Sequence, residues 1–418
     1  MPDDPTTGDP PERPAPDDAP EHPVPDDAPE PRSGHVAGLR RIGVFVGCGV
    51  ATLVAALVLL LRPGAGDNAP PDDASGLDAW APYWALESSL PEVAAHSEDL
   101  RELSPFWYAA EGVDSIVVDG NAPAAEVEAF LVAARDAGAT IVPSVVDALE
   151  PGEMATLLAD PAQRTRHAQA LAEFAASGDF AGLDIDYEQF AFADDRSTWI
   201  TTRPSWVAFI EELAEQLHAD GRTLTVSIPP VYDTGRTPDS GYWVYDYAAI
   251  APLVDRIRVM AYDYSTASAG PIAPLEWVQQ AIDGTVAASG DPGKLVLGIP
   301  AYGYNWVVAT TGTCPDGEDS GRTGVTARSA PELARRRRAE PVYDETTGEW
   351  AFTYQLELSD GATACTQTRQ VRYVDGEGAL AGAALAEAAG FGGSSLWALG
   401  YEDEAFWNGL TEVGPRGA

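Results

Sequence analysis

The feature that most constrains the fold is an alternation of short apolar segments with amphipathic segments over residues 77–418. Strand-like segments occur at 79–84, 106–108 with 115–118, 140–146, 180–186, 223–228, 256–262, 294–299 and 394–399. Helix-like periodicity separates them, at 124–137, 162–176, 206–219, 275–288 and 379–389. Strands alternating with helices over this length predict an α/β protein built as a (β/α)8 TIM barrel, and favour it over an open doubly wound sheet. No Gly-x-Gly-x-x-Gly follows the first strand, which weakens a dinucleotide-binding fold further.

The residues before the predicted barrel have a different character. Residues 1–35 repeat Pro-Asp-Asp-Ala-Pro-Glu at 16–21 and 25–30, so we expect an extended acidic tail. Within 36–62, residues 42–61 carry no charge and would span about 30 Å as a helix, which predicts a single transmembrane anchor. Arg32, Arg40 and Arg41 precede this run, so the positive-inside rule places the tail in the cytoplasm and the barrel outside the cell membrane. A cleaved signal peptide is the alternative, and residues 63–76 are predicted to be a linker.

Residues 304–375 interrupt the alternation between the predicted seventh and eighth strands. This stretch is rich in Thr, Gly and Tyr, and we expect a small α+β insertion there. It contains Cys314 and Cys365, which outside the membrane would most simply form a disulfide, with two free thiols as the alternative. Closing a loop of this length would contribute about 4 kcal/mol to stability in the chain-entropy model.

Charge and residue spacing exclude several classes of partner. The chain has 65 acidic and 25 basic side chains, so it could not neutralise a run of phosphates, and nucleic acid is excluded as a partner. The clustered bases, Arg335 to Arg338, are flanked by Glu332 and Glu340 and are interpreted as a solvated helix face. No Cys/His spacing indicates zinc, so we expect no metal and no cofactor, and we expect a monomer.

The segment Phe180-Ala-Gly-Leu-Asp-Ile-Asp-Tyr-Glu188 carries the most chemical information. In a strand, Asp184, Asp186 and Glu188 would share one face, with neighbouring carboxylates about 7 Å apart. Such a row of like charges raises at least one pKa, which keeps a neutral carboxylic acid available near neutral pH. The row would lie at the C-terminal end of the fourth barrel strand, where catalytic groups of such barrels are found.

This segment resembles the signature of glycoside hydrolase family 18, Asp-Gly-x-Asp-x-Asp-x-Glu, whose members include chitinases and endo-β-N-acetylglucosaminidases. Ala181 stands where the signature has its first Asp. Three further segments resemble the sixth, seventh and eighth strands of the family: Met260-Ala-Tyr-Asp263, Leu295-Val-Leu-Gly-Ile-Pro-Ala-Tyr-Gly303 and Gly392-Gly-Ser-Ser-Leu-Trp397. Other short segments resemble the spore-cortex and cell-wall branch of the family, namely 341–344, 352–354 and 397–403.

The resemblance implies substrate-assisted hydrolysis with retention of configuration. Glu188 would be the acid that protonates the glycosidic oxygen, and the substrate's own 2-acetamido oxygen would attack the anomeric carbon. Asp186 would orient the acetamido N–H, and Asp184 would share a proton or hydrogen bond with Asp186. Tyr262 and Asp263 would fix the acetamido group from the opposite wall, and Trp397 would offer an apolar face to the sugar ring.

We therefore expect a glycosidase that cleaves β-linked N-acetylhexosaminyl bonds, with peptidoglycan as the first choice of substrate and chitin fragments as the second. The alternative is a non-catalytic, lectin-like barrel at the cell surface, because this fold does not by itself imply activity. Glu188 argues against the alternative and Ala181 favours it.

Overall fold

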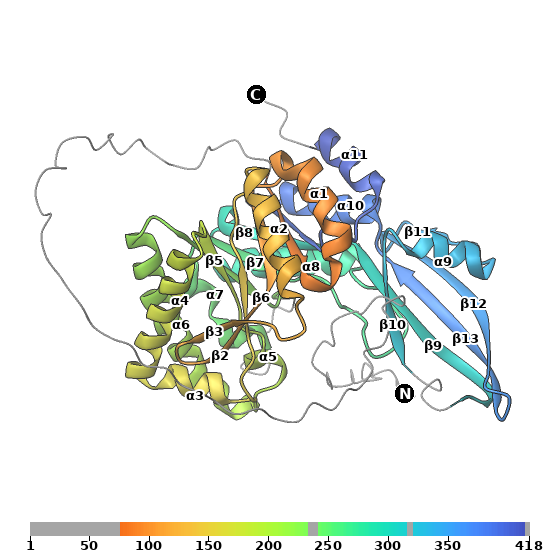
Figure 1. Cartoon of the computed structure of the whole chain (residues 1–418), viewed down its shortest axis with the longest axis horizontal. Coiled ribbons are helices and arrows are strands. Elements are labelled where there is room, and N and C mark those ends of the chain that lie inside the picture. Colours follow the sequence, from red (N-terminus) through yellow and green to blue (C-terminus); the bar gives the residue numbers. More distant parts are fainter. Residues whose placement is uncertain (1–75, 233–240, 316–320, 414–418) are drawn as a thin grey trace, which may run out of the picture.

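The structure is a computed structural model that describes residues 76–232, 241–315 and 321–413. Its core is a closed barrel of eight parallel strands in the order β1-β2-β4-β5-β6-β7-β8-β14, with β14 pairing back onto β1. The prediction of a (β/α)8 barrel is confirmed, and Figure 1 shows helices arranged around it.

The barrel strands are short, and nearly every residue in them is buried or half-buried. Their bounds are β1 Leu77–Pro82, β2 Glu102–Gly112, β4 Ser144–Asp147, β5 Gly182–Asp186, β6 Thr223–Ile228, β7 Arg256–Val259, β8 Leu295–Pro300 and β14 Gly393–Trp397. The α-helices are α1 Leu86–His96, α2 Ala124–Asp136, α3 Glu153–Ala159, α4 Pro161–Ser177, α5 Gln189–Phe192, α6 Trp199–Ala219, α7 Tyr247–Ile250, α8 Leu275–Ser289, α9 Ala330–Arg337, α10 Gly376–Ala388 and α11 Glu404–Val413. Short 3-10 helices are η1 Tyr83–Ala85, η2 Ser97–Asp99, η3 Arg196–Thr198, η4 Gly241–Tyr245 and η5 Pro292–Lys294.

Helix α4 illustrates how the sequence forms the outer layer. Its N-cap is Asp160, whose carboxylate accepts a 2.9 Å hydrogen bond from the Ala162 N–H, and Pro161 occupies the first turn. Ala168, Leu171 and Ala175 are spaced by three and four residues and are fully buried against the barrel.

Several predicted strand ends differ from the observed ones: the first strand ends at Pro82, the sixth at Val259 and the eighth at Trp397, each two or three residues early. The second and third strands differ more. The second one is a hairpin, because β2 runs on to Gly112 and then pairs antiparallel with β3, Ser115–Val118. The third begins at Ser144 instead of residue 140. Pro143 has no N–H to donate to a neighbouring strand, so the ladder is interrupted there and only an isolated bridge joins Leu103 to Ile141.

The residues between β8 and β14 in the sequence, where an insertion is predicted, form a second sheet. It is antiparallel, in the order β10-β9-β13-β12-β11, and projects from one side of the barrel in Figure 1. Its strands are β9 Tyr302–Thr313, β10 Arg322–Thr326, β11 Val342–Asp344, β12 Glu349–Ser359 and β13 Ala364–Tyr373. Together with α9 they make the small α+β unit that was expected.

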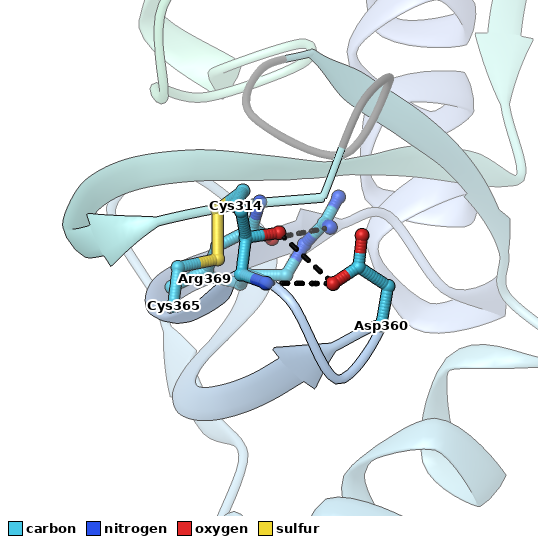
Figure 2. Close-up of a disulfide and its surroundings, with 6 residues drawn as sticks. Cys314, Asp360, Cys365 and Arg369 are labelled. Atoms are coloured by element: carbon cyan, nitrogen blue, oxygen red, sulfur yellow. Dashed lines mark hydrogen bonds between the residues drawn. A yellow bond between two sulfur atoms is a disulfide. The ribbon is translucent and has the colours of Figure 1, made fainter.

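The predicted disulfide between Cys314 and Cys365 is present in this insertion. The two Cα atoms lie 4.7 Å apart, within the usual range for a disulfide. Figure 2 shows the bond with Arg369 and Asp360 beside it. Cys365 belongs to β13 and Cys314 follows the last residue of β9, so the disulfide joins two paired strands where both approach the end of the sheet.

The residues of the predicted tail (1–35), the predicted membrane anchor (36–62, with its apolar run 42–61) and most of the predicted linker (63–76) lie outside the described residues. Across the described ranges, no helix is both long enough and apolar enough to span a bilayer.

Candidate active site

The acidic segment forms β5, the fourth strand of the barrel. Asp184 and Asp186 are buried and face the barrel interior, while Leu183 and Ile185 are fully buried on the opposite side. The predicted alternation is therefore confirmed within the strand. The strand ends at Asp186, so Glu188 lies just beyond it, at the N-terminus of α5.

Gly182 explains why this strand begins as it does. A Cβ at this position would lie 2.2 Å from Thr223 Oγ1 and 2.3 Å from the Thr223 carbonyl oxygen. Only glycine allows β5 to approach β6 this closely, and this approach fixes the height of the carboxylates in the barrel.

Asp184 is held by four donors from four other strands. Its Oδ2 accepts from Trp80 Nε1 at 3.1 Å, from Ser144 Oγ at 2.6 Å and from Arg258 Nη1 at 3.0 Å, and its Oδ1 accepts from Ser227 Oγ at 2.8 Å. Among the described residues, no hydrogen bond joins the side chains of Asp184 and Asp186. Asp184 is thus an acceptor with a fixed orientation.

Asp186 differs from Asp184 in the hydrogen bonding of its carboxyl group. Its Oδ1 is buried and has no hydrogen-bond partner in the described part of the chain. Burial raises the pKa of Asp186 well above its usual range, and the nearby charges of Glu188 and Asp184 raise it further, while Arg258 acts in the opposite direction. A buried carboxyl with a free oxygen can receive a ligand's N–H.

Glu188 is half-buried and follows Asp186 by two residues. Burial, with a smaller contribution from the charge of Asp263, raises the pKa of Glu188 to about 7. A carboxyl with this pKa is protonated in part at neutral pH, so it can donate a proton and later accept one.

The segment between these two carboxyls is fixed through Tyr187. Its hydroxyl hydrogen bonds to His167 Nε2 at 2.7 Å, and its backbone carbonyl accepts from the Tyr245 hydroxyl, also at 2.7 Å. All three side chains are buried, so the backbone between Asp186 and Glu188 is held from two sides.

Tyr262 and Asp263 follow β7, the sixth barrel strand. The Asp263 Oδ1 accepts hydrogen bonds from the hydroxyls of Tyr302, at 2.5 Å, and Tyr304, at 2.8 Å. Burial raises the pKa of Asp263, although both tyrosines partly oppose the shift. Burial raises the pKa of Tyr262 as well, and the charges of Glu188, Asp186 and Asp263 add to the effect, which places these groups around one centre.

Trp397 is the last residue of β14 and is buried in an aromatic cluster. Its ring centroid lies 4.9 Å from Phe106, 5.6 Å from Trp80 and 6.5 Å from Tyr262. Trp80 is also a donor to Asp184, so this cluster is continuous with the acidic strand.

The structure thus brings Asp184, Asp186, Glu188, Tyr262 and Asp263 together, with Trp397 beside them.

Sequence reasoning missed two groups of residues around this site. The first group comprises the partners of Asp184, namely Trp80, Ser144, Ser227 and Arg258, and the second comprises Tyr302, Tyr245 and His167. The available signal was weak: the four partners occupy inward-facing positions of their strands, but no motif spacing links them. Within the described ranges, no group of three His, Cys, Asp or Glu side chains is arranged to hold a metal ion.

Comparison with known proteins gives these residues a context. Two curated relatives come from Bacillus subtilis (strain 168). The "Putative sporulation-specific glycosylase YdhD" is 30% identical over 156 residues, which is 36% of this chain but only about a third, 34%, of YdhD. The "Uncharacterized glycosylase YvbX" is 26% identical over 262 residues, 62% of this chain and 69% of that protein.

Solved structures share the fold. A chitinase from Chromobacterium violaceum ATCC 12472 superposes with a TM-score of 0.66 at 24% identity, over 82% of this chain and 100% of that one. A chitinase-like agglutinin from Robinia pseudoacacia superposes with a TM-score of 0.61 at 16% identity, over 81% and 99% of the two chains. The family model described as "Glycosyl hydrolases family 18" matches residues 130–402, which include the acidic strand and the last barrel strand. Since this match covers more than half of the sequence, the chain belongs to glycosyl hydrolases family 18.

Proposed function

We propose that this protein hydrolyses β-linked N-acetylglucosamine glycans by substrate-assisted catalysis with retention of configuration. The observation that carries the proposal is Glu188, a carboxyl with its pKa raised to about 7 that occupies the acid position of the family signature. Asp186 supports it, because its buried Oδ1 is free to accept the acetamido N–H of a bound sugar.

In the proposed reaction, Glu188 donates its proton to the glycosidic oxygen as the bond to the leaving sugar breaks. The acetamido carbonyl oxygen attacks the anomeric carbon and forms an oxazolinium ion, so no protein side chain becomes covalently attached. Asp186 accepts a hydrogen bond from the acetamido N–H and stabilises the positive charge. Glu188, now ionised, then takes a proton from the water that opens the oxazolinium ring.

Three side chains would position the sugar. Tyr262 and Asp263 would fix the acetamido group, with Tyr302 and Tyr304 holding Asp263 in place through hydrogen bonds. Trp397 would support the C–H face of the ring.

Peptidoglycan is the substrate that we propose first, and chitin oligosaccharides second. The relative named as a putative sporulation-specific glycosylase supports a cell-wall substrate, and the structural likeness to a chitinase is compatible with the second choice. We also propose that a transmembrane segment at 42–61 anchors the barrel outside the cytoplasm. The disulfide supports this location, because disulfides persist in oxidising compartments.

A lectin-like barrel is the second candidate function. Two observations favour it, namely Ala181 in place of the first Asp of the signature and the fold shared with a chitinase-like agglutinin. Hydrolysis is preferred because all three carboxylates next to the reaction centre are present.

Product analysis tests the proposal. The full-length protein, its Glu188→Gln variant and a Glu173→Gln control, in which an exposed carboxyl of α4 is replaced, are incubated with chitooligosaccharides and with purified peptidoglycan. Mass spectrometry of the wild type and the control should detect fragments with a reducing N-acetylhexosamine, and Glu188→Gln should release none. Sugar binding without release by the wild type would support the lectin instead.

A further inference from the structure

A cavity of about 390 Å³ lies at the end of the barrel where its strands begin. Its lining comes from the residues that precede three neighbouring strands, namely 139–141 before β4, 179–181 before β5 and 220–222 before β6, together with Arg135 in the last turn of α2. Ala181 precedes β5 and Asp186 ends it, so the cavity and the candidate active site lie roughly 16 Å apart along an extended strand. Small-molecule sites typically enclose about 300–1,000 Å³, so this cavity is large enough to hold a ligand.

Four charged side chains line this cavity, and they carry both signs of charge. Arg135 and Arg222 are the bases, and Asp179 and Asp220 are the acids. Within the described ranges, none of the four forms an ion pair with another side chain. The lining therefore offers ion-pair partners to a ligand that carries both an anionic and a cationic group.

Both guanidinium groups are held by the turn that joins α4 to β5. Nη2 of Arg135 donates to the Gly178 carbonyl oxygen at 3.0 Å, and Nη1 of Arg222 donates to the Phe180 carbonyl oxygen. Each group keeps further N–H donors, and Nε of Arg222 is buried without a hydrogen-bond partner among the described residues. Guanidinium donors in a fixed position suit a carboxylate, which can accept two parallel hydrogen bonds.

The backbone of Asp179 shows that a side chain is retained at a position that favours glycine. Its φ is 52°, in the left-handed region where a Cβ costs free energy. The corresponding positions after α2, α6, α8 and α10 are glycines, namely Gly138, Gly221, Gly290 and Gly390. At the end of α4 the chain instead keeps a carboxylate in the lining of the cavity, which is a reason to look for a role of that carboxylate.

Ala181 explains why the arginines have no acidic partner from the barrel itself. It lines the cavity at the position where the family signature has its first Asp. A methyl group supplies neither a charge nor an acceptor, so an anion beside Arg135 and Arg222 would have to come from a ligand. Because Asp179 and Asp220 would repel an anion alone, the lining favours a ligand that also carries a cation.

We propose that this cavity is a binding site for a zwitterionic amino-acid group, whose carboxylate binds Arg135 and Arg222 and whose ammonium binds Asp179 and Asp220. A free α-amino acid has these two groups, and so does a peptide of the cell wall that keeps a free amino group close to a free carboxylate. The site is separate from the proposed hydrolysis, so a ligand bound here would leave the candidate active site free.

Isothermal titration calorimetry of the full-length protein tests this proposal without any turnover. Alanine carries both charges, whereas acetate carries only the anion and methylammonium only the cation, so alanine should bind at least about tenfold more tightly than either. Peptides released from purified peptidoglycan by an amidase form the second arm. Tighter binding of these peptides would assign the site to the wall, and tighter binding of alanine would assign it to a free amino acid. Acetate binding as tight as that of alanine would refute the zwitterion.

Three variants should change this binding in different ways. Arg135→Gln removes an exposed guanidinium and Ala181→Asp adds a carboxylate that competes for the arginines, so each should weaken alanine binding about tenfold. Asp220→Asn should weaken the binding of alanine but strengthen that of acetate, because it removes a negative charge from the lining. Arg336→Gln, which replaces an exposed arginine of α9, is the control and should bind alanine as the wild type does.

Two results would overturn the proposal. One is that the wild type binds neither alanine nor the peptides, and the other is wild-type affinity in Arg135→Gln and in every other folded variant of the cavity. Arg135→Gln should also cleave chitooligosaccharides at the wild-type rate, because the cavity is remote from Glu188. An inactive wild type that still binds alanine would refute the proposed hydrolysis and leave this binding site established.

Discussion

The ionisation of Glu188 makes a quantitative prediction about the alkaline side of the activity profile. Its pKa of about 7 results first from burial and second from the charge of Asp263. Because Glu188 must be protonated to act as an acid, kcat/KM should fall above pH 7. At pH 8 about one tenth of the molecules still carry the proton on Glu188, and kcat/KM should fall about tenfold with each further pH unit.

Replacing Asp263 separates the two contributions to the pKa of Glu188, which are burial and the charge of Asp263. Asp263→Asn removes the neighbouring negative charge but leaves Glu188 as buried as before, so the alkaline limb should move to lower pH by about half a unit to one unit. Asp136→Asn is the matched control, since Asp136 is an exposed residue at the C-terminal end of α2. Initial rates on a chitooligosaccharide between pH 4 and 10 measure both limbs. A limb near pH 4.5 in the wild type, or one that Asp263→Asn leaves in place, would refute the assignment of Glu188.

Three further predictions concern stability. Burial raises the pKa of Glu349 to about 7. The stability that its protonated form contributes is fully present below pH 4.5 and is lost as the pH rises through 7. Between pH 5 and 8, the free energy of unfolding measured with urea should therefore fall by about 2 kcal/mol more in the wild type than in Glu349→Gln. An equal fall in both proteins would contradict this prediction. Replacing both Cys314 and Cys365 by Ser should lower the free energy of unfolding by about 4 kcal/mol, because the bond closes a loop with a sequence separation of 51, and an unchanged urea midpoint would contradict the estimate. Gly182→Ala should destabilise the barrel by about 1–3 kcal/mol and reduce activity, because the new methyl group would collide with Thr223; a variant with native melting temperature and activity would show that β5 can shift freely.

Much of the fold could be predicted because its signal is local. The alternation of apolar strands with amphipathic helices gave the eight barrel strands, and the period of two in 183–186 placed Asp184 and Asp186 on the inner face. Strand ends were less predictable. Pro143 shortens β4 by removing a ladder donor, and the hairpin of β2 with β3 depends on a turn that the apolar pattern does not reveal.

The residues of the candidate site also differ in how well the sequence predicts them. Glu188, Asp186 and Asp184 could be found because they lie in one short segment, and Tyr262 and Asp263 because their motif follows a recognisable strand. Arg258 and Ser227 could not be found, since their contact with Asp184 exists only after three strands close into the barrel interior. Tyr302 and Tyr304 reach Asp263 from the first strand of the insertion, a pairing that depends on how the two sheets meet.

The central claim is that the substrate's acetamido group replaces a protein nucleophile. The most direct measurement is proton NMR of the first product released from a β-linked N-acetylglucosamine oligosaccharide, recorded before the anomers equilibrate. Retention through the oxazolinium ion predicts that the β-anomer appears first, and that an oligosaccharide without 2-acetamido groups is not cleaved. A first product in the α configuration, or cleavage of the substrate that lacks the acetamido group, would contradict the mechanism.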